Sequence, residues 1–134
     1  MRGATIRDKR DHLRADLVHR LNVAEFEKFL HQLMAAAFAH PSARLLIYAH
    51  VPRATLKIEK FHASYFLEVL ASRPALKVAL VATHREVQIA QQYVEALARM
   101  KKANLRSFTD EAAALAWLLT PLPATKRPGV RRTT

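Results

Sequence analysis

The sequence predicts an α/β protein built on a single, mostly parallel sheet of four to five strands with helices packed on it. Two short apolar runs, 45–51 and 76–82, have the length and composition of strands that are buried on both faces. Longer segments after each run repeat their apolar residues with the period of a helix. Strands that alternate with helices across short turns form parallel sheets with right-handed crossovers.

The N-terminal part of the chain predicts a strand and then a long helix. Residues 13–21 alternate between apolar and polar side chains, which favours a half-buried strand, although leucines in this segment also fit a helical period. This first strand could run antiparallel at an edge, and residues 5–7 could add a further edge strand. Asn22 and Glu25 have the spacing of a capping box. The helix that they open ends before Pro41.

The remaining helices and strands are predicted from the spacing of apolar residues and from the residues typical of turns and helix caps. Thr83 and Glu86 form a second capping-box pattern, and we expect Thr109-Asp110 to cap the last helix. In that helix we expect Ala112, Leu115, Leu118 and Leu119 to be buried. The predicted elements are a strand at 45–51, a helix at 56–70, a strand at 76–82, a helix from the cap at Thr83 to about Lys102, a short strand near an edge at 105–108 and a helix at 111–119.

Length and composition restrict the function classes. The 134 residues suit one domain, which we place at 1–120, followed by a flexible basic tail at 121–134. Only two glycines occur, Gly3 and Gly129, so the middle of the chain has no glycine-rich phosphate loop. Without cysteine, the chain has no disulfide and no thiolate nucleophile. The apolar runs are too short to span a bilayer and no secretion signal is present, so we expect a cytoplasmic protein.

The net charge of +11 suggests nucleic acid as a partner, but the distribution of the charge argues against it. Residues 1–20 carry six basic and three acidic side chains, and residues 121–134 carry four basic and none acidic. Most of the excess therefore lies near the termini. We expect the basic tail to favour solubility rather than to bind nucleic acid.

Two stretches resemble the STAS domain superfamily. One is the lysine-containing strand Leu76-Lys77-Val78-Ala79-Leu80-Val81-Ala82. The other is the ending from Leu105 to Leu119, in which a short strand closes with Phe108 and a helix runs from Glu111-Ala112 to Ala116-Trp117-Leu118. Both are similar to the SpoIIAA-like branch of the superfamily, whose prototype is the bacterial anti-sigma-factor antagonist. The resemblance spans about residues 13–119.

The resemblance implies a non-enzymatic module that binds a protein partner or, in some relatives, a small or lipid-like ligand. Signalling members carry a phosphorylatable Ser or Thr in an Asp-Ser-Ser-Gly-type turn after a central strand. The corresponding residues here are 52–55, which lack the aspartate, the serine pair and the glycine. Only Thr55 offers a hydroxyl. We expect it to cap the next helix, and phosphate there would lie beside Arg53 and Lys57.

One group of polar residues gathers where the predicted strands end. His50 closes one buried run, Thr83 and His84 follow the other, and Thr55 begins the helix between them. Because parallel strands end at the same edge of a sheet, these four residues could share a ligand crevice. The plainer interpretation makes His50 a hydrogen-bonded core or rim residue and His84 an exposed residue of a first helical turn.

The sequence contains no recognisable catalytic or metal-binding pattern. The seven histidines form no i,i+4 pair, so we predict no metal site and no cofactor. No serine lies in a nucleophile-elbow pattern, and Asp110 and Glu111 are explained by helix capping.

We therefore expect a non-enzymatic regulatory or binding module that acts through protein–protein interaction, with a second copy of itself as one partner. One alternative is a carrier of a lipid or small apolar ligand, which needs an apolar cavity beneath the 56–70 helix. Another is a nucleic-acid-associated protein that uses its basic termini.

Overall fold

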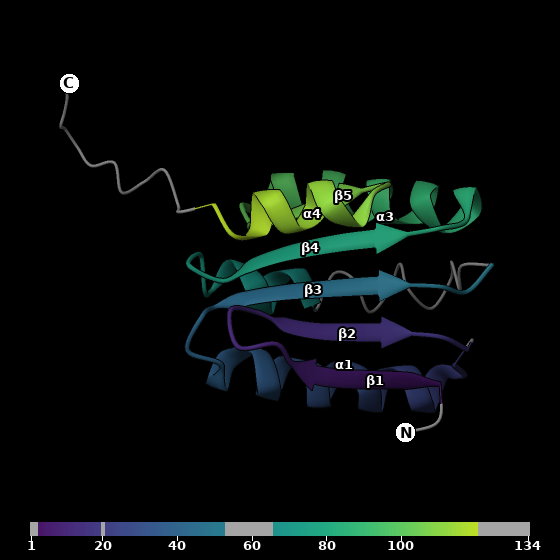
Figure 1. The fold of residues 1–134 in the computed structure, drawn as a ribbon, viewed down its shortest axis with the longest axis horizontal. Coiled ribbons are helices and arrows are strands. Elements are labelled where there is room, and N and C mark those ends of the chain that lie inside the picture. The colour runs from purple at the N-terminus through teal and green to yellow at the C-terminus, as the bar shows by residue number, and fades with distance from the viewer. Residues whose placement is uncertain (1–2, 20, 53–65, 121–134) are drawn as a thin grey trace, which may run out of the picture.

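A computed structural model describes residues 3–19, 21–52 and 66–120, and it has the predicted α/β architecture (Figure 1). Five strands form one sheet in the order β1-β2-β3-β4-β5. β1 is antiparallel to β2, and the other three neighbouring pairs are parallel. The strands are β1 (Ala4–Asp8), β2 (Leu13–Leu17), β3 (Arg44–Ala49), β4 (Lys77–Ala82) and β5 (Leu105–Phe108), and the helices are α1 (Val23–Ala39), α3 (Arg85–Lys101) and α4 (Glu111–Leu118).

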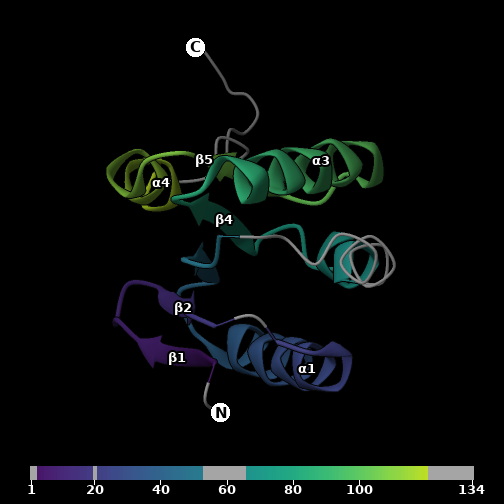
Figure 2. The ribbon, with the colours of Figure 1, turned by 90° about the vertical axis from the view of Figure 1, so that its right-hand side faces the viewer.

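The strand order places helices unequally on the two faces of the sheet. Strands β2 to β5 follow one another in sequence and in space, so right-handed crossovers place every connecting helix on the same face. Figure 2 shows α1, the helical residues 66–71 and α3 on that face, whereas α4 is the one helix of the described residues on the other. α4 packs on β3, β4 and β5. On its side of the sheet, none of the helices in the described residues covers β1 and β2 (Figure 2).

Helix caps agree with the sequence in two of the three predicted cases that fall within the described residues. Asn22 and Glu25 form the predicted capping box of α1. The side chain of Asp110 accepts a hydrogen bond from the backbone N–H of Ala113 and so caps α4. The capping box predicted for Thr83 and Glu86 is wrong: His84 is the N-cap of α3 and makes no side-chain cap hydrogen bond.

The N-terminal strands differ from the prediction in length and place. The segment 13–21 forms a strand only over Leu13–Leu17, so the strand interpretation is confirmed in a shorter form. β2 is an interior strand parallel to β3, whereas the antiparallel edge strand is β1, which contains the predicted 5–7 segment. Antiparallel pairing with β1 covers the second side of β2 because a tight connection at residues 9–12 turns the chain back on itself.

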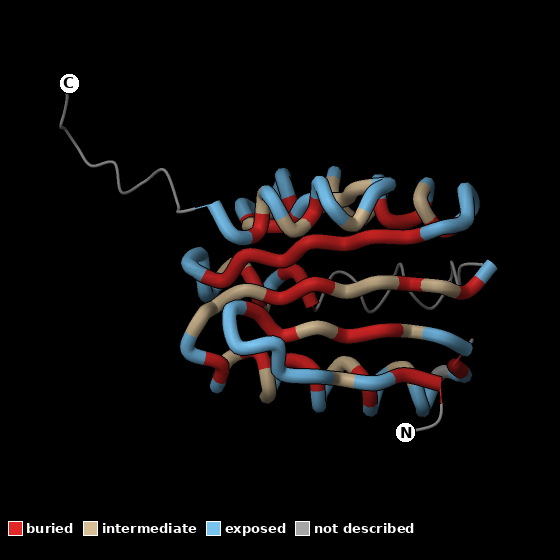
Figure 3. The backbone as a smooth tube through the Cα atoms, in the orientation of Figure 1, coloured by how far each residue is buried: buried red, intermediate tan, exposed pale blue. Residues whose placement is uncertain are grey.

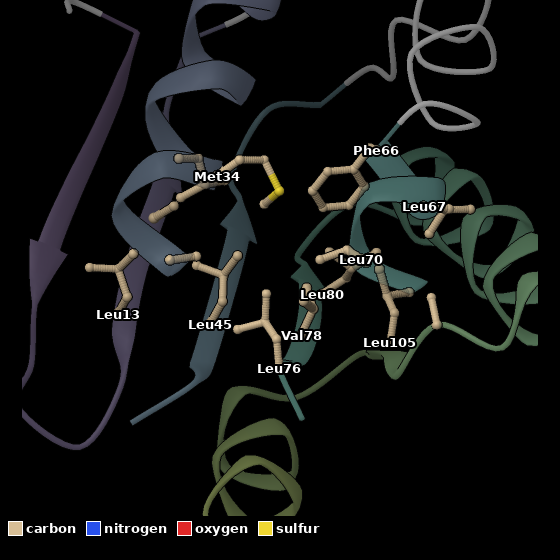
Figure 4. Packing of buried hydrophobic residues seen from close by; sticks show 14 of the residues in the cluster. Leu13, Met34, Leu45, Phe66, Leu67, Leu70, Leu76, Val78, Leu80 and Leu105 are labelled. Atoms are coloured by element: carbon tan, nitrogen blue, oxygen red, sulfur yellow. The ribbon is translucent and has the colours of Figure 1, made fainter. Parts of the chain in front are cut away.

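The main core lies between the sheet and the helices on one of its faces, α1, residues 66–71 and α3. All six residues of β4 are buried, which Figure 3 shows as a continuous buried strand through the centre of the sheet. In Figure 4, Leu45, Val78 and Leu80 point from the strands towards Met34 of α1 and Phe66. A smaller cluster lies under α4 and includes Leu46, Ala79, Val81, Ala114 and Leu118.

Two predictions of burial on α4 are wrong. Ala112 is exposed and Leu119 keeps 38% of its accessible surface, whereas Leu118 is buried. α4 ends at Leu118, and only one of its sides faces the sheet. A helix that packs on a sheet through one side buries a narrow stripe, and Ala112 lies outside that stripe.

Most of the helix predicted at 56–70, including Thr55 just before it, lies outside the described residues, as does the tail at 121–134. Of this helix the structure describes residues 66–71, where Phe66, Leu67 and Leu70 are buried against the sheet. No helix in the described part of the chain is long and apolar enough to cross a membrane.

Candidate functional site

The sheet face that carries α4 brings together charged and aromatic side chains from β1, β2 and β3. The pairing register places Asp16 beside Tyr48, and Arg14 beside both Leu46 and Arg7. Leu46 packs under α4, so side chains that share its face point to the same side of the sheet. We name Arg7, Arg14, Asp16, Tyr48 and His50 the open-face cluster.

Asp16 is the centre of the open-face cluster. Its side chain is only 8% exposed. It accepts hydrogen bonds from Nη2 of Arg7 at 3.0 Å, from Nε and Nη2 of Arg14 at 2.9 and 3.0 Å, and from Nε2 of His50 at 2.9 Å. Because donors from β1, β2 and the end of β3 meet on one carboxylate, Asp16 fixes the positions of Arg7, Arg14 and His50.

The protonation state of Asp16 follows from these contacts. Burial raises the pKa of the carboxyl, but the hydrogen bonds from Arg14, His50 and Arg7 outweigh burial and lower the pKa to about 2. Asp16 is therefore a carboxylate at neutral pH. A carboxylate only accepts hydrogen bonds, so Nε2 of His50 carries the proton that joins them.

Arg14 links the cluster to α4. Its Nη1 donates a hydrogen bond of 2.6 Å to Oε2 of Glu111, in the first turn of the helix. The hydrogen bond to Asp16 raises the pKa of Arg14 above its ordinary value, and the bond to Glu111 adds to this effect. Glu111, which the sequence assigned to helix capping, therefore also anchors the start of α4 on β2.

The exposed part of the cluster is made by His50, Tyr48 and Arg7. The rings of Tyr48 and His50 are stacked, with centroids 4.1 Å apart and an angle of 7° between their planes. The guanidinium carbon of Arg14 lies 5.5 Å from the centroid of Tyr48. The side chains of His50 and Arg7 are 36% and 57% exposed. The site thus presents an oriented imidazole, an aromatic ring and a guanidinium to solvent.

The four residues predicted for a ligand crevice have different surroundings. His50 contacts Asp16 and Tyr48. Thr83 and His84 are exposed after β4 and hydrogen-bond to each other, with 3.0 Å between Oγ1 and Nδ1. Thr55 lies outside the described residues, so the crevice stays a prediction.

A second cluster lies at the opposite end of the strands. His40 is buried at the end of α1, where its Nε2 lies 2.9 Å from Oδ1 of Asp8 and its Nδ1 lies 2.7 Å from Oγ of Ser42. The hydrogen bond from His40 lowers the pKa of Asp8, and the backbone N–H of Arg10 adds to this. Nδ1 also accepts the backbone N–H of Ser42. His40 therefore ties the end of β1 to the turn before β3.

A cavity of about 270 Å³ opens at the end of β5, between α3 and α4. Polar side chains line it together with one aromatic ring and one methyl group. The backbone N–H and the hydroxyl of Ser107 both donate to the carboxylate of Glu95, which closes part of the outer edge of β5. The lining residues are Gln88, Gln92, Ser107, Phe108, Thr109, Asp110 and Ala113.

Metal ligands do not gather in the part of the chain that the structure describes, where no three His, Asp or Glu side chains are placed to hold an ion. Comparisons with protein-family models, with curated proteins and with solved structures found no match for this chain. By its fold, the protein is an α/β domain with a five-stranded, mostly parallel sheet.

Most of the open-face cluster was missed from the sequence, which singled out only His50. The missed signal is the segment Leu13-Arg14-Ala15-Asp16-Leu17, where two opposite charges occupy alternate positions of a strand. Alternate positions of a strand share one face, so a strand at this segment necessarily places Arg14 and Asp16 side by side. Nothing in the sequence showed that β3 would add His50 and Tyr48 beside them.

Proposed function

We propose that the protein is a non-enzymatic binding module that recognises a partner protein through the open-face cluster. The observation that carries the proposal is a carboxylate, Asp16, that is 8% exposed and is held by donors from Arg7, Arg14 and His50. It lies on a part of the sheet face that no helix of the described residues covers. A buried ionic network contributes little net stability compared with apolar residues of similar volume. Its value here is to hold an exposed imidazole and guanidinium in fixed positions.

Preorganised polar and aromatic groups are typical of protein recognition sites. Arg and Tyr are enriched at the centres of interfaces, and side chains fixed before binding lose little entropy on association. Arg7 is already oriented by Asp16 and retains 57% of its exposure, and exposed Lys9 and Arg10 follow it. We therefore propose that the partner presents carboxylates to this surface.

The resemblance to STAS domains supports the same class of function, because members of that superfamily act by binding partners. Under this proposal the cluster, rather than a phosphorylated turn at Thr55, provides the contact surface. A cytoplasmic location is part of the proposal. The alternative of an apolar-ligand carrier depends on the helix predicted at 56–70, of which residues up to 65 are outside the described residues. The alternative of a nucleic-acid-associated protein depends on both basic termini, of which 121–134 are outside the described residues.

Site-specific photo-crosslinking tests the proposal. Benzoylphenylalanine placed at Thr5, which is exposed and shares the face with Asp16, is expected to form a discrete covalent adduct with one protein in cells that produce this chain. The matched control is the same probe at Gln32, on the exposed side of α1. The captured protein is then purified and its affinity measured.

Substitutions in the cluster then separate recognition from chance capture. Arg7→Glu and His50→Ala are each expected to weaken binding of the purified partner at least about tenfold, and added salt should weaken it further. Gln32→Ala should leave the affinity unchanged. Equal adducts at both probe positions, or affinities that these two cluster variants do not change, would contradict the proposal.

A further inference from the structure

The outer side of α3 exposes three large apolar side chains in one line. Ile89, Tyr93 and Met100 keep 52%, 45% and 79% of their accessible surface. At 100° per residue, positions four and eleven residues apart point within about 40° of each other. The buried side of the helix, which includes Ala98, lies on the opposite side of its axis. We name Ile89, Tyr93 and Met100, together with exposed Ala96 between them, the α3 stripe.

The spacing along the α3 stripe is the same in both directions. The intervals from Ile89 to Tyr93, from Tyr93 to Ala96 and from Ala96 to Met100 are four, three and four residues. A stripe with this symmetry meets a reversed copy of itself position for position. Ile89 then lies opposite Met100 of the second copy, and Tyr93 lies opposite Ala96 of the second copy.

The sizes of these opposed side chains are complementary in the antiparallel arrangement. Each ring of Tyr93 meets the methyl group of Ala96, so a large side chain fills the space that a small one leaves. Ile89 and Met100 are both apolar, so their contact removes apolar surface from water. A parallel arrangement would instead place Tyr93 against Tyr93 and leave a gap between the two Ala96 methyl groups, and such gaps lose packing contacts.

The charges of α3 also favour the antiparallel arrangement. The C-terminal end of the helix carries three cations: Arg99 and Lys101, which pair with Glu95 and Glu68, and Lys102. The first turn balances Arg85 with the exposed carboxylate of Glu86. A parallel pair would bring six cations together at one end. An antiparallel pair places each basic end beside the first turn of the other copy, and the two helix dipoles then oppose each other.

We propose that the α3 stripe is a docking surface for a second copy of this chain, with the two α3 helices packed antiparallel about a two-fold axis. Each stripe then serves as surface and partner at once, as an isologous interface requires. The helix–helix contact is small, so the dimer is in exchange with the monomer.

This inference goes beyond the proposed function and does not depend on it. α3 and α4 lie on opposite faces of the sheet (Figure 2). The pairing register places the open-face cluster on the face of α4. The dimer therefore leaves both open faces accessible and would bind two partners. Substitutions in the α3 stripe test only the dimer, and substitutions at Arg7 or His50 test only partner binding.

Sedimentation equilibrium of the full chain is the first test. We expect a monomer–dimer equilibrium, and we expect Ile89→Glu and Met100→Glu each to raise the dissociation constant at least about tenfold. The matched control is Val18→Glu, which changes another exposed apolar residue, 43% exposed, outside α3. Thermal unfolding of each variant checks that it remains folded.

Two results of the sedimentation experiment would overturn the proposal. One is a full chain that is monomeric at every concentration, which is also the result expected if another segment of the same chain covers the stripe. The other is an effect of Val18→Glu equal to that of the two stripe variants, which would place the contact between copies outside α3.

Cross-linking tests the direction of the helices. The chain contains no cysteine, so introduced thiols are unique. A mixture of Ile89→Cys and Met100→Cys chains treated with a short bismaleimide is expected to cross-link mainly between unlike chains. Preferential cross-linking between two Ile89→Cys chains would indicate a parallel pair and would overturn the proposal.

Discussion

Replacement of Asp16 by Asn tests the physical basis of the open-face cluster. Asn keeps the shape of the side chain but removes the negative charge to which Arg7, Arg14 and His50 donate hydrogen bonds. The pKa of Asp16 lies near 2 rather than at 3.8, since its hydrogen bonds outweigh burial. A factor of ten in an acid constant corresponds to about 1.4 kcal/mol, so these contacts stabilise the folded protein by about 2 kcal/mol at neutral pH.

The direction of the pH dependence follows from the lowered pKa. The folded protein favours the ionised form of Asp16 more than the unfolded chain does. The stabilisation from ionised Asp16 is therefore complete above the unfolded pKa of 3.8 and disappears as the pH falls through 2. Asp16→Asn should lower the free energy of unfolding by about 2 kcal/mol at pH 7. At pH 2.5 the difference from the unmodified protein should shrink to about 1 kcal/mol.

Urea denaturation of both proteins at pH 7 and pH 2.5, followed by circular dichroism, measures the two differences. Glu27→Gln, an exposed carboxylate-to-amide change on α1, is the control and should alter stability by less than about 0.5 kcal/mol. A loss for Asp16→Asn that is the same at both pH values would refute the argument from the pKa. So would a loss no larger than that of the control.

Three further substitutions test packing and capping. Lys77 is buried and its Nζ donates to the carbonyls of Trp117 and Thr120 at 2.6 and 2.7 Å, so Lys77→Met should cost about 2 kcal/mol and speed hydrogen exchange of the α4 amides. Asn22→Ala removes the capping box of α1 and should lower the free energy of unfolding by about 1 kcal/mol in urea titrations. Leu33→Ala at a fully buried position of α1 should lower the melting temperature and cost about 3 kcal/mol through the cavity that it leaves. An α4 exchange rate unchanged by Lys77→Met, a neutral Asn22→Ala or a loss below about 1 kcal/mol for Leu33→Ala would contradict these arguments.

Local signals predicted much of the fold correctly. The apolar runs at 45–51 and 76–82 became β3 and β4, because a continuous apolar strand is stable only when both of its faces are covered. The cap at Asn22 formed as predicted, since its hydrogen bonds join residues that are close in sequence. The pattern at Thr83 and Glu86 has the same spacing but failed. The hydroxyl of Thr83 lies against the ring of His84 instead, and α3 starts one residue later.

The candidate site was less predictable because its partners are distant in sequence. Asp16 is separated by 34 residues from His50, and Arg14 by 97 residues from Glu111. In the sequence, Lys77 was noted only as part of a strand that resembles one in STAS domains. Its hydrogen bonds to the carbonyl groups at the end of α4 were not predicted. Each of these contacts requires the strand order and the face on which α4 packs.

The sequence by itself determined the α/β class, the two central strands and most helix boundaries, since hydrophobic period and capping act within a few residues. Only the tertiary structure decided that β2 lies inside the sheet, that α4 packs on the face opposite α1 and α3, and that Asp16 meets Arg7, Arg14 and His50. Strand order and register bring together residues with no local relation, and the electrostatic energy of a group depends on what surrounds it in space.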